Sequence, residues 1–254
     1  MATATLLPSV LPLLWASPGF AAAYLWFALG LGPRLMRGRE PLRPKTVLAA
    51  YNALQVALNV AMLCKSVSLF VDRRYDLMCP RAQPPLHVVM GDSQAHAFAL
   101  EVARVAHYQA SMRLLDLADT VFIVLAKKTR HLTFLHLYHH CSVILFAWTI
   151  LKIDIGGTVT LLPASINNFV HATMYSYYLL SLFGFQLARS CKKYITQLQI
   201  LQFVLVVLYL LQAIMRKDCN TSLPIIGLNF TQGVVFLWLF LQFYRGAYHK
   251  KKEV

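Results

Sequence analysis

Seven apolar segments, each long enough to cross a lipid bilayer, constrain the fold of this 254-residue chain more than any other feature. A spanning helix needs about 20 mainly apolar residues, with a range of about 17 to 25. Inside a bilayer the backbone must satisfy its own hydrogen bonds, so such segments fold as helices. They are residues 14–33, 46–70, 97–126, 131–153, 158–184, 193–215 and 223–245. The sequence therefore predicts an all-α integral membrane bundle of seven transmembrane helices.

Composition agrees with a membrane protein. The chain is 58% hydrophobic and only 13% charged, whereas a soluble domain carries about 25% charged residues. Its net charge of +14 would also suit a nucleic-acid-binding protein. The basic residues, however, lie in short clusters between apolar segments and not along one soluble surface, so we expect no nucleic-acid partner. No repeat or long linker divides the sequence, and residues 1–254 are expected to form a single domain.

The positions of lysine and arginine predict how the chain is oriented. Cytosolic loops are enriched in these residues close to the ends of the spans. One set of segment ends carries fifteen of them, and the opposite set carries six together with five aspartates. Seven spans then place the N-terminus in the lumen and the C-terminus in the cytosol. The first basic residue is Arg34, so the chain begins without the basic region of a cleaved signal peptide, and we expect the first span to be retained.

Three further predictions follow from that orientation. Cys79 and Cys219 lie in different loops on the predicted luminal side, where the environment is oxidising, and we expect them to form a disulfide. Asn220 begins a glycosylation sequon, but it adjoins Cys219 and a helix end, so we expect it to stay unmodified. Lys251 and Lys252 resemble a di-lysine retrieval signal, which operates only from a cytosolic tail and indicates an endoplasmic reticulum protein.

The segment His136-Leu137-Tyr138-His139-His140 is the strongest indication of a functional site. Its three imidazoles are spaced i, i+3 and i+4, so they share one face of a helix within an apolar segment. A membrane helix gains no structural benefit from three titratable rings on one side. Metal ligation and nucleophilic catalysis are both compatible with this motif alone.

Other spans contribute polar residues that we expect to face the interior of the bundle. A charged residue at the centre of a membrane helix costs about 2.5 to 3.5 kcal/mol if it faces lipid. The expected residues are Arg113, Asp116, Asp119 and Thr120 in the third segment, Asn167, His171, Tyr175 and Tyr178 in the fifth, and Thr196, Gln199 and Gln202 in the sixth. Arg113 and Asp116, at i and i+3, can form an ion pair. Helix-fixing salt bridges and interhelical hydrogen bonds are the purely structural alternatives.

The depth of these polar residues favours one shared site. At a rise of 1.5 Å per residue, His136 to His140 lie roughly 7 to 14 Å from the cytosolic start of their span. The polar residues of the other three spans fall at a similar level. The sequence thus predicts a polar chamber that opens to the cytosol between basic clusters. Such a chamber suits a ligand with an anionic head and an apolar tail, for example an activated acyl chain.

Two other classes of protein are alternatives to acyl transfer. Membrane di-iron desaturases and hydroxylases also use HxxHH boxes, but they combine several of them. This chain has nine histidines, five of which lie outside the predicted chamber or at its edge. We therefore expect no metal, although a mononuclear site stays open. A seven-helix receptor or transporter fits the span count, but histidines level with charged residues are a costly arrangement for ligand sensing.

Successive motifs resemble those of the very-long-chain fatty acid elongases. They are HLYHH at 136–140, Asn167 with HATMYSYY at 171–178, and TQLQILQ at 196–202, together with LGPR at 31–34 and Tyr51-Asn52. The resemblance covers nearly the whole chain, with the motifs in the family's order. It implies a seven-helix enzyme of the endoplasmic reticulum that condenses acyl-CoA with malonyl-CoA to 3-ketoacyl-CoA, carbon dioxide and CoA.

The resemblance also implies roles for individual residues. His139 would be the nucleophile, His171 would contribute to substrate binding or acylation, and His136 and His140 would support them. Arg113 and Asp116 depart from the Lys and Glu that are usual in the family, which keeps the charges but alters their reach. The remaining polar residues would bind substrate. No cofactor is implied beyond the two CoA substrates. The expected partners are membrane lipids, a second copy of the chain, and the ketoacyl reductase, dehydratase and enoyl reductase of the elongation cycle.

Overall fold

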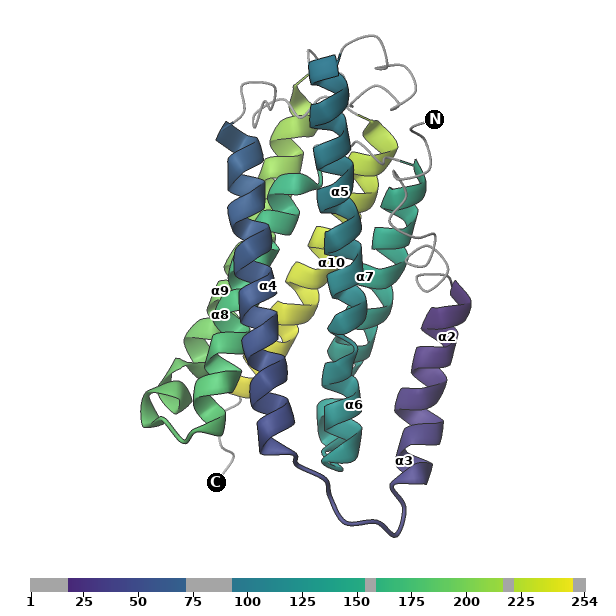
Figure 1. Cartoon of the computed structure of the whole chain (residues 1–254), viewed down its shortest axis with the longest axis vertical. Helices are drawn as coiled ribbons and strands as arrows, with labels where there is room; N and C mark the ends of the chain where they lie inside the picture. Colours follow the sequence, from purple (N-terminus) through teal and green to yellow (C-terminus); the bar gives the residue numbers. More distant parts are fainter. Residues whose placement is uncertain (1–17, 72–92, 154–158, 217–221, 249–254) are drawn as a thin grey trace. The chain divides into compact units, whose positions relative to one another are not determined.

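The computed structural model of the chain describes residues 18–71, 93–153, 159–216 and 222–248 (Figure 1). Its elements are α2 (Pro18–Trp26), the π-helix η1 (Phe27–Leu31), α3 (Gly32–Leu35), α4 (Lys45–Val71), α5 (Ser93–Leu115), α6 (Ala118–Leu125), the 3-10 helix η2 (Thr129–His131), α7 (Phe134–Ile153), α8 (Leu161–Leu182), α9 (Gln186–Met215) and α10 (Leu223–Tyr248). The prediction of an all-α fold is confirmed within these ranges. The expected Cys79–Cys219 disulfide, the Asn220 sequon and the retrieval lysines Lys251 and Lys252 lie outside the described residues.

Four of the described helices are long and apolar enough to cross a membrane. They are Lys45–Val71, Phe134–Leu151, Cys191–Met215 and Leu223–Tyr248. α8 has 22 residues but carries polar side chains that lower its mean hydropathy. The third predicted span, 97–126, is divided between α5 and α6. The membrane character of the chain is therefore supported, while the count of seven spans and their orientation stay predictions.

The chain divides into two compact units that alternate along the sequence. The first unit comprises residues 1–43 and 106–155, and the second comprises residues 44–105 and 156–254. Helix α5 contributes residues to both, because the boundary falls between Val105 and Ala106. The prediction of a single domain stays a prediction.

In the first unit, α2, η1 and α3 follow one another without a loop, and α2 packs on α7 while α3 packs on α6. Gly32 allows α3 to pack closely against α6. A Cβ atom at this position would lie 2.9 Å from both the backbone oxygen of Phe27 and Cγ1 of Val124. The chain after α3 then returns along the end of α6, where the Leu42 backbone N–H donates to the Leu125 carbonyl at 2.9 Å. The first unit thus holds the N-terminal helices against α6 and α7.

A tight turn separates α5 from α6 in the same unit. The backbone N–H groups of Asp119 and Thr120 donate to the carbonyls of Asp116 and Leu117, each at 3.1 Å. These i to i+3 bonds are of the 3-10 type, which winds the chain more tightly than an α-helix. The turn lies between the charged residues at the end of α5 and Thr120 in the first turn of α6.

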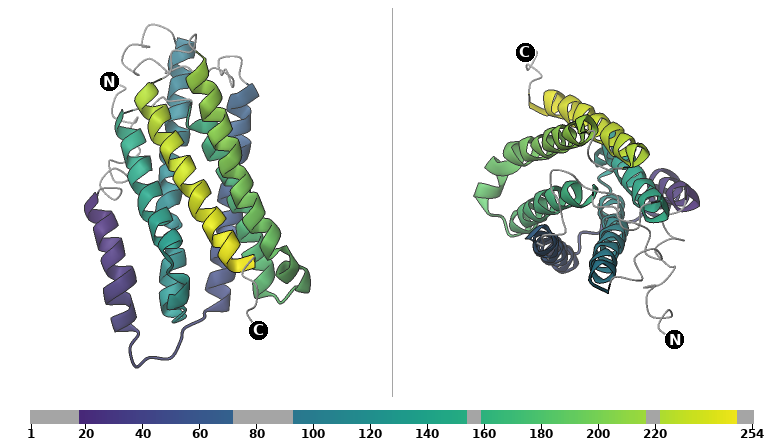
Figure 2. Two further views of the ribbon diagram at one scale, coloured as in Figure 1. Left: turned by 180° about the vertical axis from the view of Figure 1, so that it is seen from behind. Right: turned by 90° about the horizontal axis from the view of Figure 1, so that it is seen from above.

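The second unit is built from α4, α8, α9 and α10 with the N-terminal part of α5. Helices α4 and α8 run antiparallel, because Tyr51 lies beside Tyr175 whereas Leu69 clusters with Leu161. Figure 2 shows α9 and α10 side by side over most of their length. Aromatic contacts join those two helices, with the ring of Phe203 centred 5.2 Å from that of Phe236.

Candidate functional site

The three histidines of α7 form a contiguous cluster of rings. The ring centroids of His136 and His140 are 4.4 Å apart, and those of His139 and His140 are 5.3 Å apart. His140 is buried, while His136 and His139 are half-buried. The prediction that the three imidazoles share one helix face is confirmed.

Two hydroxyl groups continue the histidine cluster toward α6 and α2. Thr120 Oγ1 lies 2.8 Å from His136 Nε2 and 2.8 Å from the phenolic oxygen of Tyr24. The Tyr24 ring is also centred 6.1 Å from that of His140. Thr120 is fully buried and Tyr24 is 7% exposed. Thr120 was predicted from the sequence as part of the site, whereas Tyr24 was not.

Arg113 and Asp116 form the ion pair that their spacing predicted. Arg113 Nη1 lies 3.0 Å from Asp116 Oδ2, and the two side chains are only 10% and 1% exposed. Arg113 lies in the last turn of α5, and Asp116 follows the end of this helix, four residues before Thr120. Asp119 lies in the first turn of α6 and is half-buried. The third predicted segment therefore contributes a buried ion pair and a buried hydroxyl group to the first unit.

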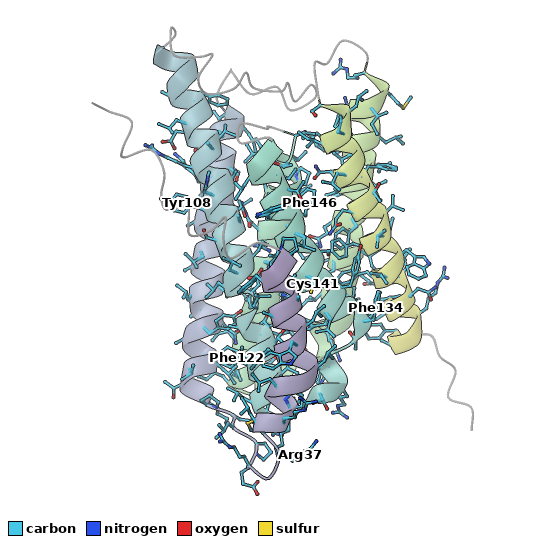
Figure 3. All side chains as sticks on the ribbon, turned by 90° about the vertical axis from the view of Figure 1, so that its right-hand side faces the viewer. Arg37, Tyr108, Phe122, Phe134, Cys141 and Phe146 are labelled. Atoms are coloured by element: carbon cyan, nitrogen blue, oxygen red, sulfur yellow. The ribbon has the colours of Figure 1, made fainter. Side chains whose placement is uncertain are left out.

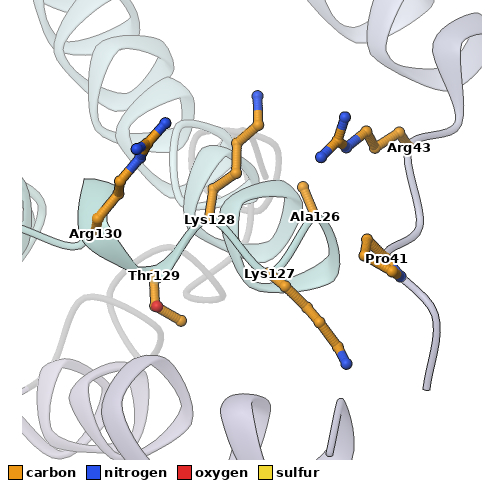
Figure 4. A pocket seen from close by; sticks show the side chains of 7 residues that line it. All are labelled: Pro41, Arg43, Ala126, Lys127, Lys128, Thr129 and Arg130. Atoms are coloured by element: carbon orange, nitrogen blue, oxygen red, sulfur yellow. The ribbon is translucent and has the colours of Figure 1, made fainter. Parts of the chain in front are cut away.

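A basic pocket of about 350 Å³ lies where α6 ends and the chain passes to α7. Its lining residues are Pro41, Arg43, Ala126, Lys127, Lys128, Thr129 and Arg130. Figure 4 shows the guanidinium of Arg43 extending toward Lys128, whereas the Lys127 side chain points away from them. The lining includes no acidic residue, and no carboxylate among the described residues pairs with these four cations. The pocket therefore gathers positive charge that no carboxylate of the described residues neutralises.

In the second unit, His171 and Tyr175 lie on the buried face of α8. Their rings are centred 5.8 Å apart in an edge-on contact. The Tyr175 hydroxyl is 3.4 Å from that of Tyr51, and Gln55 Nε2 donates to both hydroxyls, at 3.4 and 3.0 Å. Tyr178 touches the Tyr175 ring but is 41% exposed. The predicted polar stripe of α8 is therefore buried at His171 and Tyr175 and open at Tyr178.

Polar side chains also link α8 to α9. Asn167 Nδ2 donates to Gln202 Oε1 at 3.4 Å, and Gln199 Nε2 donates to the sulfur of Met174 at 3.5 Å. Thr196 is buried, and its hydroxyl donates to the Lys192 carbonyl of its own helix at 3.2 Å. The structure therefore brings the predicted residues of the fifth and sixth segments together within the second unit.

Sequence reasoning missed the polar face that α4 presents to α8. Its buried side chains are Tyr51, Asn52, Gln55, Asn59 and Ser66, and α8 contributes Ser165 and Asn168. Within the part of the chain that the structure describes, both amide atoms of Asn168 lack a hydrogen-bond partner. The spacing of 51, 55 and 59 by four residues in an apolar segment is the signal that would have identified this face.

The predicted site residues thus fall into two groups. The first unit holds the histidine box with Arg113, Asp116 and Thr120, and the second unit holds His171 and Tyr175 with their partners on α4 and α9. The single chamber that would unite the two groups stays a prediction. No three His, Cys, Asp or Glu side chains among the described residues are grouped so that they could hold a metal ion.

The chain is similar to one protein family and to several named proteins. A family model described as the GNS1/SUR4 (ELO) family matches residues 10–254. The chain is 34% identical over 246 residues to very long chain fatty acid elongase 1 of Homo sapiens. The matched residues make up 96% of this chain and 84% of that protein. It is 33% identical over 234 residues to elongase 7 of Rattus norvegicus, covering 91% and 80%. It is 30% identical over 239 residues to elongase F of Drosophila melanogaster, covering 93% and 90%.

Proposed function

Because this chain belongs to the GNS1/SUR4 family, we propose that it condenses a long-chain acyl-CoA with malonyl-CoA to give 3-ketoacyl-CoA, carbon dioxide and CoA. The names of its relatives support a role in fatty acid elongation. The observation that carries the chemistry is the cluster of three imidazole rings on α7, in which one ring is held by Thr120. An imidazole is a competent acyl acceptor at neutral pH, so such a cluster suits covalent acyl transfer.

The first half-reaction would load the acyl group onto His139. A ring nitrogen of His139 attacks the thioester carbon, the carbon–sulfur bond breaks, and the CoA thiolate takes up the proton that the acylated ring releases. His139 suits this role better than its neighbours. Nε2 of His136 already bonds to Thr120, and His140 is buried, whereas His139 is half-buried. The product of this step is an acyl-imidazole enzyme and free CoA.

The second half-reaction would consume malonyl-CoA. Loss of carbon dioxide leaves the bonding electron pair on the neighbouring carbon as an enolate, and this carbon attacks the acyl carbonyl. The bond between the acyl group and the ring nitrogen then breaks, which releases 3-ketoacyl-CoA. The departing ring nitrogen takes up one proton from water, which restores the neutral imidazole and replaces the proton that CoA carried away in the first half-reaction. The enolate carries developing negative charge, so it needs preorganised donors. His136, His140, Asn167 and Gln199 are the candidates.

Replacing His139 tests the acyl-enzyme. We expect His139→Ala and His139→Gln to lose both the acyl adduct, measured by intact mass after incubation with acyl-CoA, and the labelled 3-ketoacyl product. Wild-type enzyme should also show parallel double-reciprocal plots, because free CoA leaves before malonyl-CoA reacts. Tyr108→Phe is the matched control, since Tyr108 is 57% exposed in the same unit (Figure 3). Normal condensation by both His139 variants would refute this mechanism.

The basic pocket is a candidate site for the phosphates of the CoA nucleotide. Arginine and lysine bind phosphate through charge-assisted hydrogen bonds, and Arg43, Lys128 and Arg130 lie together there without a carboxylate partner among the described residues. The double change Lys128→Gln with Arg130→Gln should raise KM about tenfold for acyl-CoA. It should leave KM unchanged for an acyl-pantetheine, which lacks the nucleotide. An equal rise for both substrates would argue against phosphate binding.

We place the enzyme in the endoplasmic reticulum membrane, with seven spans, a luminal N-terminus and a cytosolic C-terminus. The clusters of lysine and arginine and the four apolar helices support this topology. The proposal includes the Cys79–Cys219 disulfide and retrieval through Lys251 and Lys252. On this topology the basic pocket faces the cytosol, where CoA substrates are dissolved. Relocation to the cell surface should follow Lys251→Ser with Lys252→Ser, and retention of that variant would contradict the signal.

A further inference from the structure

The hydrogen-bonded chain of Tyr24, Thr120 and His136 connects three helices through two bonds of the same length. Tyr24 comes from α2, Thr120 from α6 and His136 from α7, and both oxygen–oxygen and oxygen–nitrogen distances are 2.8 Å. All three residues belong to the first unit. Within the described part of the chain, these two bonds are the only side-chain hydrogen bonds that Tyr24 and Thr120 make.

The number of hydrogens on each group determines which group donates in these two hydrogen bonds. A hydroxyl group has one hydrogen to donate, whereas a neutral imidazole has one donor nitrogen and one acceptor nitrogen. For the Tyr24 hydrogen to be used, Tyr24 must donate to Thr120. Thr120 can then use its own hydrogen only by donating to Nε2 of His136. The opposite direction would leave the Tyr24 hydrogen without an acceptor among the described residues, which is costly in a buried setting.

This direction determines the protonation of His136. Because Nε2 accepts the Thr120 hydrogen, a neutral His136 carries its proton on Nδ1. An imidazolium would need to donate from Nε2 as well, which would deprive a hydroxyl hydrogen of its acceptor. His136 is therefore held as a neutral ring with a single donor, and its Nε2 lone pair is unavailable for attack on a thioester or for accepting a proton.

We infer that Tyr24 is a positioning residue of the histidine box, acting through Thr120 to keep the proton of His136 on Nδ1. The catalytic importance of this effect rests on the proposed function, but the protonation state itself does not. Tyr24 is well placed for the role because its ring also contacts His140. Helix α2 thereby helps to prepare the histidine box, although it contributes no group to the reacting atoms.

A spectroscopic measurement tests the protonation state without any assay of activity. Full-length protein labelled with ¹⁵N-histidine is reconstituted in phospholipid bilayers, and the His136 signals are assigned by their loss in His136→Gln. In the wild type we expect Nδ1 to show the shift of a protonated ring nitrogen and Nε2 that of an unprotonated one. In Tyr24→Phe and Thr120→Val the two nitrogens should show a mixture of both states. A protonated Nε2 in the wild type overturns the inference.

Kinetics then measure what the chain of hydrogen bonds contributes to the reaction. Thr120→Val should lower kcat on the order of 100-fold and Tyr24→Phe on the order of tenfold, as supporting hydrogen bonds do in other sites. KM for acyl-CoA should be unchanged, Thr120→Ser should restore kcat to within about threefold, and Tyr108→Phe should behave as wild type. Unchanged kcat in Tyr24→Phe, or no rescue by serine, overturns the positioning role. A wild type that forms no 3-ketoacyl product but shows the expected nitrogen shifts refutes the proposed function and leaves the protonation inference standing.

Discussion

The polar clusters of the two units differ in the lengths of their hydrogen bonds. In the first unit, Thr120 bonds to its two partners at 2.8 Å. In the second unit, the bonds of Tyr175 to α4 are 3.4 Å long. There, among the described residues, Ser66 Oγ and both amide atoms of Asn168 have no partner. The first unit also holds such a group, because Gln109 Nε2 has no hydrogen-bond partner among the described residues. The comparison therefore teaches that the two units differ in how closely their polar clusters are bonded, and not in whether buried polar groups are left unpaired.

The ion pairs of the two units differ in burial. Arg113 and Asp116 of the first unit are almost completely buried, whereas Lys65 and Glu101 of the second unit, 2.8 Å apart, are 46% and 33% exposed. Removing one partner from a buried pair leaves an uncompensated charge, but removing one from an exposed pair leaves a solvated charge. The two pairs should therefore respond very differently to the same type of substitution.

The largest effect is expected from Asp116→Asn. This change keeps the size of the side chain but leaves the Arg113 charge buried without its partner, which should cost about 3 to 5 kcal/mol of stability. The matched change Glu101→Gln should cost less than about 1 kcal/mol. Thermal unfolding in detergent, at roughly 2 to 4 °C per kcal/mol for a chain of this size, separates the two results. Equal shifts for both variants would remove the distinction between the pairs.

A smaller effect is expected from the glycines at helix contacts. Gly32→Ala should destabilise the protein by about 1 to 3 kcal/mol, because the new methyl group would meet a backbone oxygen that cannot move aside easily. Gly233→Ala should be close to neutral, since its methyl group would meet only side-chain atoms, of Val207 at 3.2 Å and of Val206 at 3.7 Å. Gly227→Ala, with open space around it, should stabilise α10 by roughly 0.5 to 1 kcal/mol. Unfolding midpoints of the three variants give the ranking, and a neutral Gly32→Ala would show that α3 can move away from α6.

The smallest effect is expected from Asn168→Leu, and its sign is opposite. Leucine has the same branching as asparagine but no polar atoms, so it removes a buried amide that has no partner among the described residues. Such a group costs about 1 to 3 kcal/mol, and we expect the variant to be stabilised by about 1 kcal/mol. A loss of stability would indicate instead that ordered water satisfies this amide, as water does in many buried polar sites. The sign of the change in stability therefore shows whether the buried Asn168 amide is unpaired or hydrated.

The helical fold could be predicted because length and apolarity alone require it in a bilayer. The interruption between α5 and α6 could not be predicted, because segment 97–126 has the length of a single span and the turn depends on local 3-10 hydrogen bonds. The division of α2, η1 and α3 involves π-type hydrogen bonds instead, since the Gly32 backbone N–H donates to the Phe27 carbonyl, five residues earlier. Apolar periodicity reports which residues avoid water, but it does not report where the hydrogen-bond register of a helix changes.

The candidate site was predictable where its residues share one helix. The spacing of His136, His139 and His140 was sufficient to place their rings together, as was the spacing of Arg113 and Asp116. Tyr24 was not predictable, because a single tyrosine in an apolar segment carries no periodic signal. Its partner lies 96 residues away in the sequence. Long-range pairing of this kind depends on which helices become neighbours, and a single sequence contains no measure of that.

The 96-residue separation between Tyr24 and Thr120 also has a consequence for biosynthesis. At a translation rate of about 5 to 20 residues per second, α2 leaves the ribosome roughly 5 to 20 s before α6 does. During that interval the Tyr24 hydroxyl has none of the partners that it has in the finished protein. Helix α2 must therefore be stabilised by the insertion machinery, by lipid or by transient contacts until α6 and α7 have been made. The hydrogen bonds around the histidine box can therefore form only after α6 and α7 have been made and have packed against α2.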